Sequence, residues 1–330
     1  PGGNRRRVRG FREREPCRAV AGSKPEADLM PKLNLANGLR VHYEQVGTGP
    51  DLVMIHGIGG HLATWHFKIV PLLWDRYRIL TYDLRGHGYS EMTEKGYTPT
   101  ELAADFVQLL DALGIEKADI VGHSFGGDIA LYVAYYYPER VRNLVLIEAL
   151  VPAMAKILTR DDFKRADWAA NVLEKLGVHI PEERRYDTDY MLAEAVKMPN
   201  KWGPMKGLPR RKNRHDDWLE KLYTQTPILK EALDVGELTE ENITNIKTPV
   251  HLIYDSGSLM WHKSFRFLRD SLPNVSWTLL GIEAGKLSHF SPLEKPESVV
   301  EHILNGLAPF DERKKQSRGS IFPWRSTEAG

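Results

Sequence analysis

A serine between two glycines, in the segment Gly122–Gly126 with the sequence G-H-S-F-G, is the feature of this chain best suited to covalent chemistry. In a G-x-S-x-G motif the serine stands on a sharp turn between a strand and a helix, where its hydroxyl is exposed and the glycines let neighbouring backbone approach. The apolar run Ala118–Val121 precedes the motif, and the apolar residues at helical spacing after it are Ile129, Ala130, Val133, Ala134 and Tyr137. These flanks predict the required strand and helix, and they favour Ser124 as a nucleophile over a serine that only caps a helix.

The segments around this motif alternate between short apolar runs and helical patterns. The apolar runs are typical of buried strands, and they are Leu52–Ile55, Arg78–Tyr82, Asp119–Val121, Leu144–Ile147 and Val250–Tyr254. This alternation predicts an α/β fold with a doubly wound, mostly parallel sheet. Upstream, Asn37 and Gly38 lie between the alternating runs Lys32–Leu35 and Leu39–Gln45, which predicts a β-hairpin.

One helix can be predicted together with both of its ends. Thr98 is suited to the N-cap, Pro99 to the first helical position and Glu101 to a capping box. Gly114 is placed to end the helix. The apolar residues between these ends recur at helical spacing and are Leu102, Phe106, Leu109, Leu110 and Leu113.

The strand and helix patterns divide the chain into a core and additional segments. Residues 30–148 and 246–310 carry the α/β pattern. Residues 149–245 are charged, interrupted by prolines and helical in period, so they predict a helical cap inserted after one core strand. Residues 1–29, in which arginines alternate with glycine and proline, predict a disordered basic tail, or an upstream translated extension, and residues 311–330 predict a loose C-terminal tail.

Composition restricts the classes of partner. The 45 Lys and Arg residues balance 44 Asp and Glu residues, so the net charge of +1 provides no general attraction for nucleic acid or acidic lipid. The single cysteine, Cys17, rules out an internal disulfide and a cysteine-rich metal site. The sequence contains no run of eighteen apolar residues, so no membrane span is predicted. We therefore expect a cytoplasmic protein without a cofactor or bound metal, while its oligomeric state is not predicted.

The G-H-S-F-G segment and its surroundings resemble the α/β-hydrolase family, over about Lys32 to Leu307. The segment His56–Gly60, with the sequence H-G-I-G-G, follows an upstream strand and is similar to the oxyanion loop of the family. By this match the backbone N–H groups of Ile58 and Phe125 would donate to the oxygen that becomes negative in a tetrahedral intermediate.

A second segment, Asp83–Ser90 with the sequence D-L-R-G-H-G-Y-S, is similar to a further family signature. We interpret Asp83 and Arg85 as residues that anchor this loop rather than act on a substrate.

The resemblance also implies the order nucleophile, acid and histidine along the chain. The segment Ser288–Pro296, with the sequence S-H-F-S-P-L-E-K-P, resembles the histidine loop of the family, although Ser288 stands where glycine is usual. The resemblance therefore makes His289 the expected base that accepts the proton of Ser124.

The acid departs from the family pattern. An aspartate usually lies two or three residues beyond the strand that here ends at Tyr254, and this chain has Gly257 and Ser258 there. Asp255 and Glu148 each directly follow a predicted strand, at the sheet edge where sites of doubly wound folds assemble. Some family members, including a subgroup of haloalkane dehalogenases, take the acid from the earlier strand, so we favour Glu148 and keep Asp255 as the alternative.

These residues predict a serine hydrolase that cleaves a small-molecule carboxylic ester or thioester through an acyl-enzyme on Ser124. The resemblance implies that similar dehalogenases and epoxide hydrolases use an aspartate nucleophile, which this chain lacks. A carbon-carbon bond hydrolase and a cofactor-free perhydrolase or haloperoxidase-like enzyme remain alternatives. A non-catalytic ligand-binding homologue is an alternative of another class, because a fold alone does not fix function.

Overall fold

The computed structural model describes residues 31–151, 174, 179–184, 190, 194, 218–255, 259–280, 289 and 291–310. The expected basic tail (1–29), the expected C-terminal tail (311–330) and most of the expected cap (149–245) lie outside the described residues. Gly257, Ser258 and Ser288 also lie outside them. The boundaries assigned to the core and the cap therefore stay predictions.

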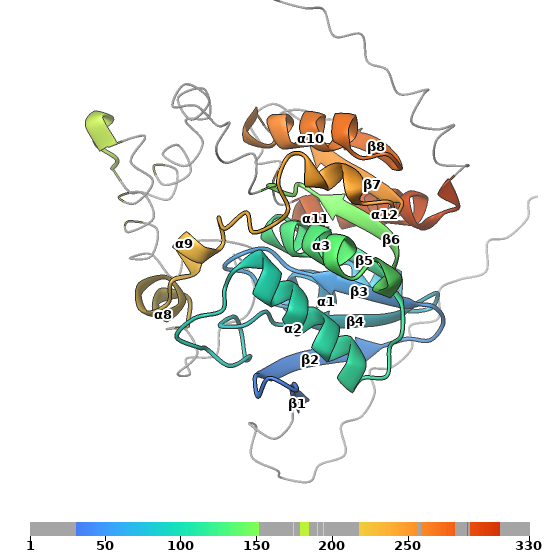
Figure 1. The fold of residues 1–330 in the computed structure, drawn as a ribbon, viewed down its shortest axis with the longest axis horizontal. Coiled ribbons are helices and arrows are strands. Elements are labelled where there is room, and N and C mark those ends of the chain that lie inside the picture. Colours follow the sequence, from blue (N-terminus) through green and yellow to red (C-terminus); the bar gives the residue numbers. More distant parts are fainter. Residues whose placement is uncertain are drawn as a thin grey trace, which may run out of the picture. The chain divides into compact units, whose positions relative to one another are not determined.

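One sheet runs through the described part of the chain (Figure 1). Its strands lie in the order β1-β2-β4-β3-β5-β6-β7-β8. Strand β2 is antiparallel to both of its neighbours, β1 and β4, and β3 to β8 are parallel to one another. The strands are β1 (Lys32–Asn34), β2 (Arg40–Val46), β3 (Asp51–Ile55), β4 (Arg78–Tyr82), β5 (Ala118–His123), β6 (Val141–Ile147), β7 (Val250–Asp255) and β8 (Val275–Leu280). The predicted doubly wound, mostly parallel sheet and its N-terminal hairpin are confirmed.

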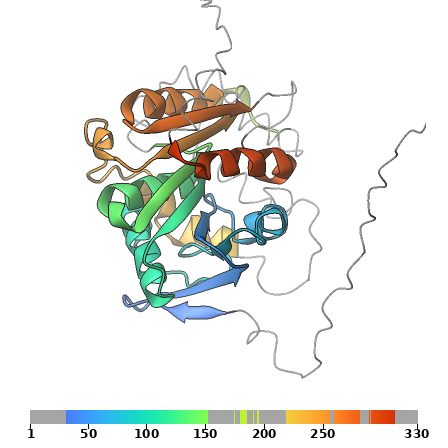
Figure 2. The ribbon, with the colours of Figure 1, turned by 90° about the vertical axis from the view of Figure 1, so that its right-hand side faces the viewer.

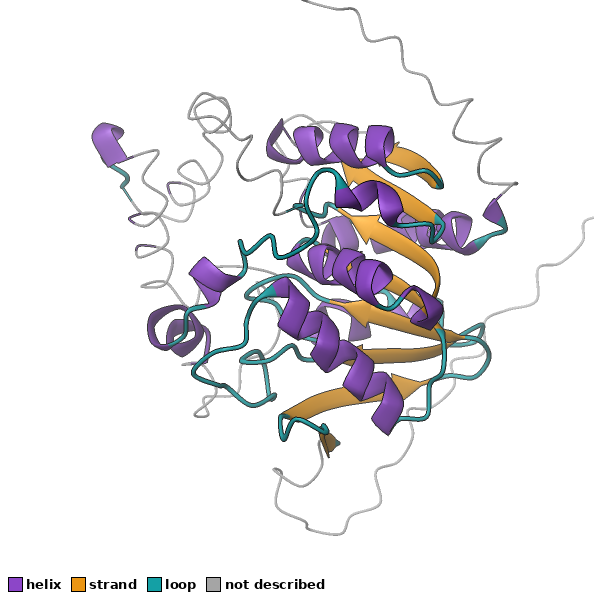
Figure 3. Ribbon diagram, in the orientation of Figure 1, coloured by secondary structure: helices purple, strands orange, loops and turns teal. Residues whose placement is uncertain are grey.

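Helices cover both faces of this sheet (Figures 2 and 3). On one face lie α2 (Pro99–Ala112), α3 (Phe125–Tyr136) and α10 (Leu259–Ser271), and on the other lie α1 (Ala63–His66) and α12 (Pro296–Leu307). The remaining helical elements are η2 (Val70–Leu72), η3 (Pro138–Arg140), η4 (Glu182–Arg184), α8 (Trp218–Gln225), α9 (Ile228–Glu231), η5 (Asn242–Asn245) and α11 (Ser291–Glu294).

The alternation of side chains along each strand produces two hydrophobic cores. In β3, Val53 and Ile55 pack with the residues of α2 and α3, whereas Leu52 and Met54 pack with Trp65 and with α12. These four side chains are fully buried, as expected for a central parallel strand that is covered on both faces. The rigid sheet between these cores is the platform on which the loops at the strand ends are held.

The capping pattern predicted for α2 is confirmed. The backbone N–H of Glu101 donates to the Thr98 hydroxyl at 3.2 Å, and Pro99 is the first helical residue. At the other end Gly114 has φ +67°, a left-handed conformation that glycine adopts without strain. These local signals fix where α2 begins and ends between β4 and β5.

The strand order places a topological switch point between β3 and β5. The chain leaves β3 toward β4 on one side, and it leaves β5 toward β6 on the other side. The two strands are paired up to their carboxyl ends, where Ile55 is opposite Gly122. The loops after these strands therefore diverge around a shared crevice, which is where ligands bind in open α/β sheets.

Candidate active site

Ser124 stands on the sharp turn between β5 and α3. Its backbone angles are φ +54° and ψ −126°, a strained conformation for a residue other than glycine. A side chain on Gly122 would overlap the backbone of Gly126, and a side chain on Gly126 would overlap the backbone of Ile55. The two glycines of the G-x-S-x-G motif are therefore required for this turn to pack.

His289 lies beside this serine. Its Nε2 atom is 3.0 Å from the hydroxyl oxygen of Ser124, although the two residues are 165 positions apart in the chain. Burial lowers the pKa of His289 to about 4, so its imidazole is neutral at pH 7. A neutral imidazole within hydrogen-bond distance can accept the proton of a hydroxyl, which is the geometry that activates a serine.

Glu148 faces the other nitrogen of His289. Its Oε2 atom lies 3.9 Å from His289 Nδ1, and its side chain is fully buried. The second oxygen, Oε1, accepts the backbone N–H of Asp255. Because β6 and β7 are neighbouring parallel strands, both candidate acids lie at the same edge of the sheet. The 3.9 Å approach of a carboxylate oxygen to the neutral imidazole is observed for Glu148.

The backbone around Glu148 is held from several sides. Glu148 has φ +49°, and its N–H donates to the carbonyl of Ile253 at 3.0 Å. The Tyr254 hydroxyl donates to the carbonyl of Ala149 at 2.6 Å, and the buried Asp128 carboxyl accepts from the backbone of Leu150. These contacts hold a left-handed residue that would otherwise cost about 1–3 kcal/mol.

Replacing Tyr254 by phenylalanine tests this support. The change leaves the buried carbonyl of Ala149 without its donor, which we expect to lower the free energy of unfolding by about 1–3 kcal/mol. We also expect a lower kcat, because Ala149, the residue that follows Glu148, loses a contact that fixes its backbone. Urea denaturation and ester turnover measure the two effects.

Tyr132→Phe provides the matched control. The Tyr132 hydroxyl also donates to backbone carbonyls, those of Val235 at 2.7 Å and Asp234 at 3.2 Å, and these acceptors are distant in the chain from Glu148. This variant should lose similar stability and keep its kcat. An equal loss of kcat in both variants would contradict a specific role of Tyr254.

The loop after β3 approaches the nucleophile closely. A side chain on Gly57 would lie 3.0 Å from the Cβ atom of Ser124. Phe125 is the first residue of α3, so its N–H has no partner within the helix. Among the described residues, no acceptor is observed for the N–H groups of Ile58 and Phe125. Both candidate donors to a negative oxygen therefore come from segments that adjoin Ser124.

Two neutral histidines fix this loop. His56 donates from Nδ1 to the carbonyl of Gly57 at 2.8 Å, and its Nε2 accepts the N–H of Leu84 at 3.1 Å. His87 accepts the N–H of Gly59 at 3.1 Å and donates from Nδ1 to the carbonyl of Arg85 at 2.8 Å. These hydrogen bonds join the loop after β3, which approaches Ser124, to the loop after β4.

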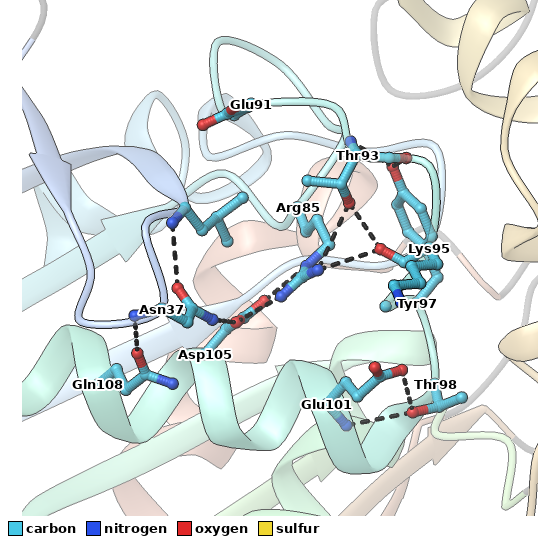
Figure 4. A network of polar contacts seen from close by, with 12 residues as sticks. Asn37, Arg85, Glu91, Thr93, Lys95, Tyr97, Thr98, Glu101, Asp105 and Gln108 are labelled. Carbon is cyan, nitrogen blue, oxygen red and sulfur yellow. Dashed lines mark hydrogen bonds and ion pairs between the residues drawn. The ribbon is translucent and has the colours of Figure 1, made fainter.

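Asp83 and Arg85 anchor the loop after β4, as predicted. Asp83 accepts the N–H of Leu62 at 2.7 Å and the N–H of Tyr89 at 2.8 Å. Arg85 forms a two-point contact with Asp105 of α2, at 2.7 and 2.9 Å, and donates to the carbonyl of Lys95 (Figure 4). Both side chains are thus engaged in structure rather than directed to a substrate.

Helix α8 covers this region from the segment expected to form the cap. A side chain added at Gly59 would lie 2.5 Å from the Tyr223 hydroxyl and 3.4 Å from Leu219, and one added at Gly86 would lie 2.8 Å from Leu222. The Trp218 ring lies 5.7 Å from the His87 ring. A described part of the expected cap therefore packs directly over the loop after β3, which approaches the nucleophile, and over the loop after β4.

Burial of histidines around the site makes stability dependent on pH. Burial lowers the pKa of His56 and His123 to about 3, and that of His87 and His289 to about 4. In the unfolded chain these groups titrate near pH 6.5, so below that pH the unfolded state binds more protons. For each histidine, a difference of one pKa unit between the folded and the unfolded state corresponds to about 1.4 kcal/mol. The free energy of unfolding must therefore fall as the pH falls.

We therefore expect the melting temperature to drop steeply between pH 7 and pH 5. Thermal denaturation at constant ionic strength measures this drop. His87→Gln, which removes one titrating group, should show a shallower dependence on pH. A melting temperature that does not change over this range would contradict the assignment of neutral buried histidines.

For several of these supporting residues the sequence gives no signal of their role. His56, His87 and His123 lie inside the predicted motifs, but nothing in the sequence indicates which partner each ring has. Asp128 and Tyr254 belong to an expected helix and strand, where their types carry no signal of a contact with the segment after Glu148. The positive φ of Glu148 has no sequence signal either.

Two further properties concern only the described part of the chain. None of its helices has the length and apolar character needed to cross a membrane. No group of three or more His, Cys, Asp or Glu side chains among these residues is arranged to hold a metal ion.

Comparison with known proteins identifies the family. The model of the alpha/beta hydrolase fold family matches residues 50–253, more than half of the chain. The chain therefore belongs to the α/β hydrolase fold family, a family of hydrolases, and the resemblance to this family is confirmed.

Individual relatives have several activities. The chain is 26% identical over 297 residues to a soluble epoxide hydrolase of Corynebacterium sp. (strain C12), which covers 83% of this chain and 96% of that protein. It is 43% identical over 116 residues to a 2-hydroxymuconate semialdehyde hydrolase of Pseudomonas sp. (strain CF600), over 34% of this chain and 41% of that protein. The second match thus covers less than half of either chain.

Solved structures share the fold. A putative alpha/beta hydrolase of Nostoc sp. PCC 7120 has a TM-score of 0.61 at 23% identity, over 84% of this chain and 97% of that one. An enol-lactonase of Burkholderia xenovorans LB400 has a TM-score of 0.58 at 22% identity, over 84% of this chain and all of that one. At these identities the likeness concerns the fold and does not assign a substrate.

Proposed function

We propose that this protein cleaves a small-molecule carboxylic ester or thioester, with Ser124 as nucleophile, His289 as base and Glu148 as the acid. The observation that carries the proposal is the 3.0 Å approach of His289 Nε2 to the hydroxyl of Ser124 on its strained turn. Nucleophile, base and a third orienting group within reach of one another are the signature of nucleophilic catalysis.

The reaction proceeds in two halves. The Ser124 oxygen attacks the carbonyl carbon while its proton passes to His289 Nε2, and the N–H groups of Ile58 and Phe125 donate to the oxygen that becomes negative. His289 then gives the proton to the leaving oxygen or sulfur as its bond to carbon breaks. In the second half His289 takes a proton from water, the hydroxide attacks the acyl-enzyme, and the released serine oxygen regains the proton.

Serine chemistry separates this proposal from the epoxide hydrolase relative. Attack of a serine oxygen on an epoxide carbon would form an ether, which has no carbonyl at which water could release the product. An acyl-serine does have such a carbonyl. The nucleophile therefore favours acyl transfer, even though the chain is similar over 297 residues to a soluble epoxide hydrolase.

A second candidate is hydrolysis of a carbon-carbon bond beside a ketone. The 43% identity to 2-hydroxymuconate semialdehyde hydrolase favours it within the segment that the two chains share. A cofactor-free perhydrolase is supported more weakly, by 35% identity over 117 residues to a putative non-heme chloroperoxidase of Synechocystis sp. (strain ATCC 27184 / PCC 6803 / Kazusa). A perhydrolase needs a peroxide as co-reactant, whereas ester, thioester and carbon-carbon bond hydrolysis each need only water.

A fluorophosphonate probe tests the proposed function. The probe should label the wild-type protein and fail to label Ser124→Ala. If neither protein reacts, the non-catalytic ligand-binding alternative is favoured instead. A series of nitrophenyl esters of increasing acyl length, with 2-hydroxymuconate semialdehyde in parallel, then defines the substrate: faster turnover of the semialdehyde than of every ester would favour the carbon-carbon candidate.

A further inference from the structure

His123 lies between Gly122 and the nucleophile, and it contacts the residue proposed as the base. Its Nε2 atom is 2.7 Å from the backbone carbonyl oxygen of His289. A carbonyl oxygen can only accept a hydrogen bond, so Nε2 of His123 must carry the proton. The ring is buried, and burial together with the neighbouring His289 lowers the pKa of His123 to about 3. At neutral pH it is therefore an uncharged donor in one tautomer.

The ring of His123 is confined by its neighbours. Its centroid lies 4.9 Å from that of the His289 ring, at an angle of 37°, and Trp65 packs against it edge-on at 6.2 Å. Its Nδ1 atom would be 3.5 Å from a side chain added at Gly57. A ring fixed between a core tryptophan, the loop after β3 and its own strand can hold a more distant segment in place.

We propose that His123 is a positioning residue that fixes the main chain of His289 and so aligns its imidazole with Ser124. The inference rests on the function proposed above. It follows from the juxtaposition of two contacts, since His289 meets Ser124 through its side chain and His123 through its carbonyl. Ser124 thus contacts the imidazole of His289, and His123 contacts its main-chain carbonyl. A displacement of about 1 Å in such a site can reduce the rate about 100-fold.

Two variants of His123 separate positioning from simple packing. His123→Phe keeps a planar ring but has no donor, and we expect its kcat to fall roughly 10-fold to 100-fold with KM changed less than about threefold. In His123→Gln the amide nitrogen reaches about as far as Nε2 and can donate to the same carbonyl. This variant should keep kcat within about fivefold of the wild type.

His251→Phe is the matched control. His251 is also a buried histidine, held by the hydroxyl of Ser276 at 2.8 Å, but it lies near the start of β7, away from the carboxyl ends of the strands. Its kcat should remain unchanged. Equal turnover of His123→Phe and His123→Gln, whether high or low, would overturn the positioning role.

The proposed function and this inference can fail separately. If wild type and Ser124→Ala react alike with the fluorophosphonate, the proposed function fails. If labelling depends on Ser124 but is equally fast in both His123 variants, only the positioning role fails. Should His123→Phe not fold, nitrogen-15 NMR of the wild type at pH 7 decides: a neutral ring protonated on Nε2 supports the inference, and a ring protonated on Nδ1 or on both nitrogens overturns it.

Discussion

Ser124→Ala should lower ester turnover by about 10⁴-fold or more, while the protein stays folded. The change removes the oxygen that forms the acyl bond, and His289 then has no hydroxyl to deprotonate at 3.0 Å. The N–H groups of Ile58 and Phe125 remain, so a residual acceleration over the reaction in water is expected. Steady-state kinetics with a nitrophenyl ester measures the loss.

Substrate binding in this variant provides the control. Because alanine has nearly the shape of serine, the positive φ of the turn and the contacts of Gly122 and Gly126 are preserved. Circular dichroism and the affinity for a product acid should therefore match those of the wild type. Turnover within tenfold of the wild type would show that Ser124 is not the nucleophile.

Glu148→Gln should lower kcat by roughly 10³-fold to 10⁴-fold, whereas Asp255→Asn should change it by less than about tenfold. The reason is charge: the Glu148 carboxylate lies 3.9 Å from His289 Nδ1 and stabilises the imidazolium that forms when the serine proton arrives. An amide of the same shape carries no charge and can orient the wrong tautomer. The backbone N–H of Asp255, which donates to Glu148, is present in Asp255→Asn as well.

The comparison of these two variants assigns the acid. Both positions lie at the ends of neighbouring strands, and each substitution preserves the side-chain shape, so their effects on folding should be similar. Kinetics at pH 7 and thermal denaturation of both variants make the test. A large loss in Asp255→Asn with little loss in Glu148→Gln would reassign the acid to β7.

The sequence predicts much of the fold because local signals are strong where elements are buried. Central strands such as β3 appear as continuous apolar runs, and α2 is marked by Thr98, Pro99 and Glu101. The edge strand β8 has no clear apolar run, because Ser276 and Thr278 interrupt its apolar residues, and it pairs with β7 on one side only. Edge strands need less burial, so their sequences carry a weaker signal.

The site is predictable where a motif carries the chemistry. The glycines around Ser124 predict its turn, and the structure places His289 beside it. The choice between Glu148 and Asp255 is not local, because it depends on the pairing of β6 with β7 and on the left-handed conformation of Glu148. The contact of His123 with the carbonyl of His289 is equally non-local, since 166 positions separate the two residues.

The central claim is that an acyl group is carried on Ser124 during turnover. Reaction with a slowly deacylating nitrophenyl ester, acid quenching and mass spectrometry of the digested protein test this claim directly. We expect the peptide that contains Ser124 to gain the mass of one acyl group, and Ser124→Ala to gain none. Product release without any acylated peptide, or acylation of another residue at the rate of turnover, would contradict the account.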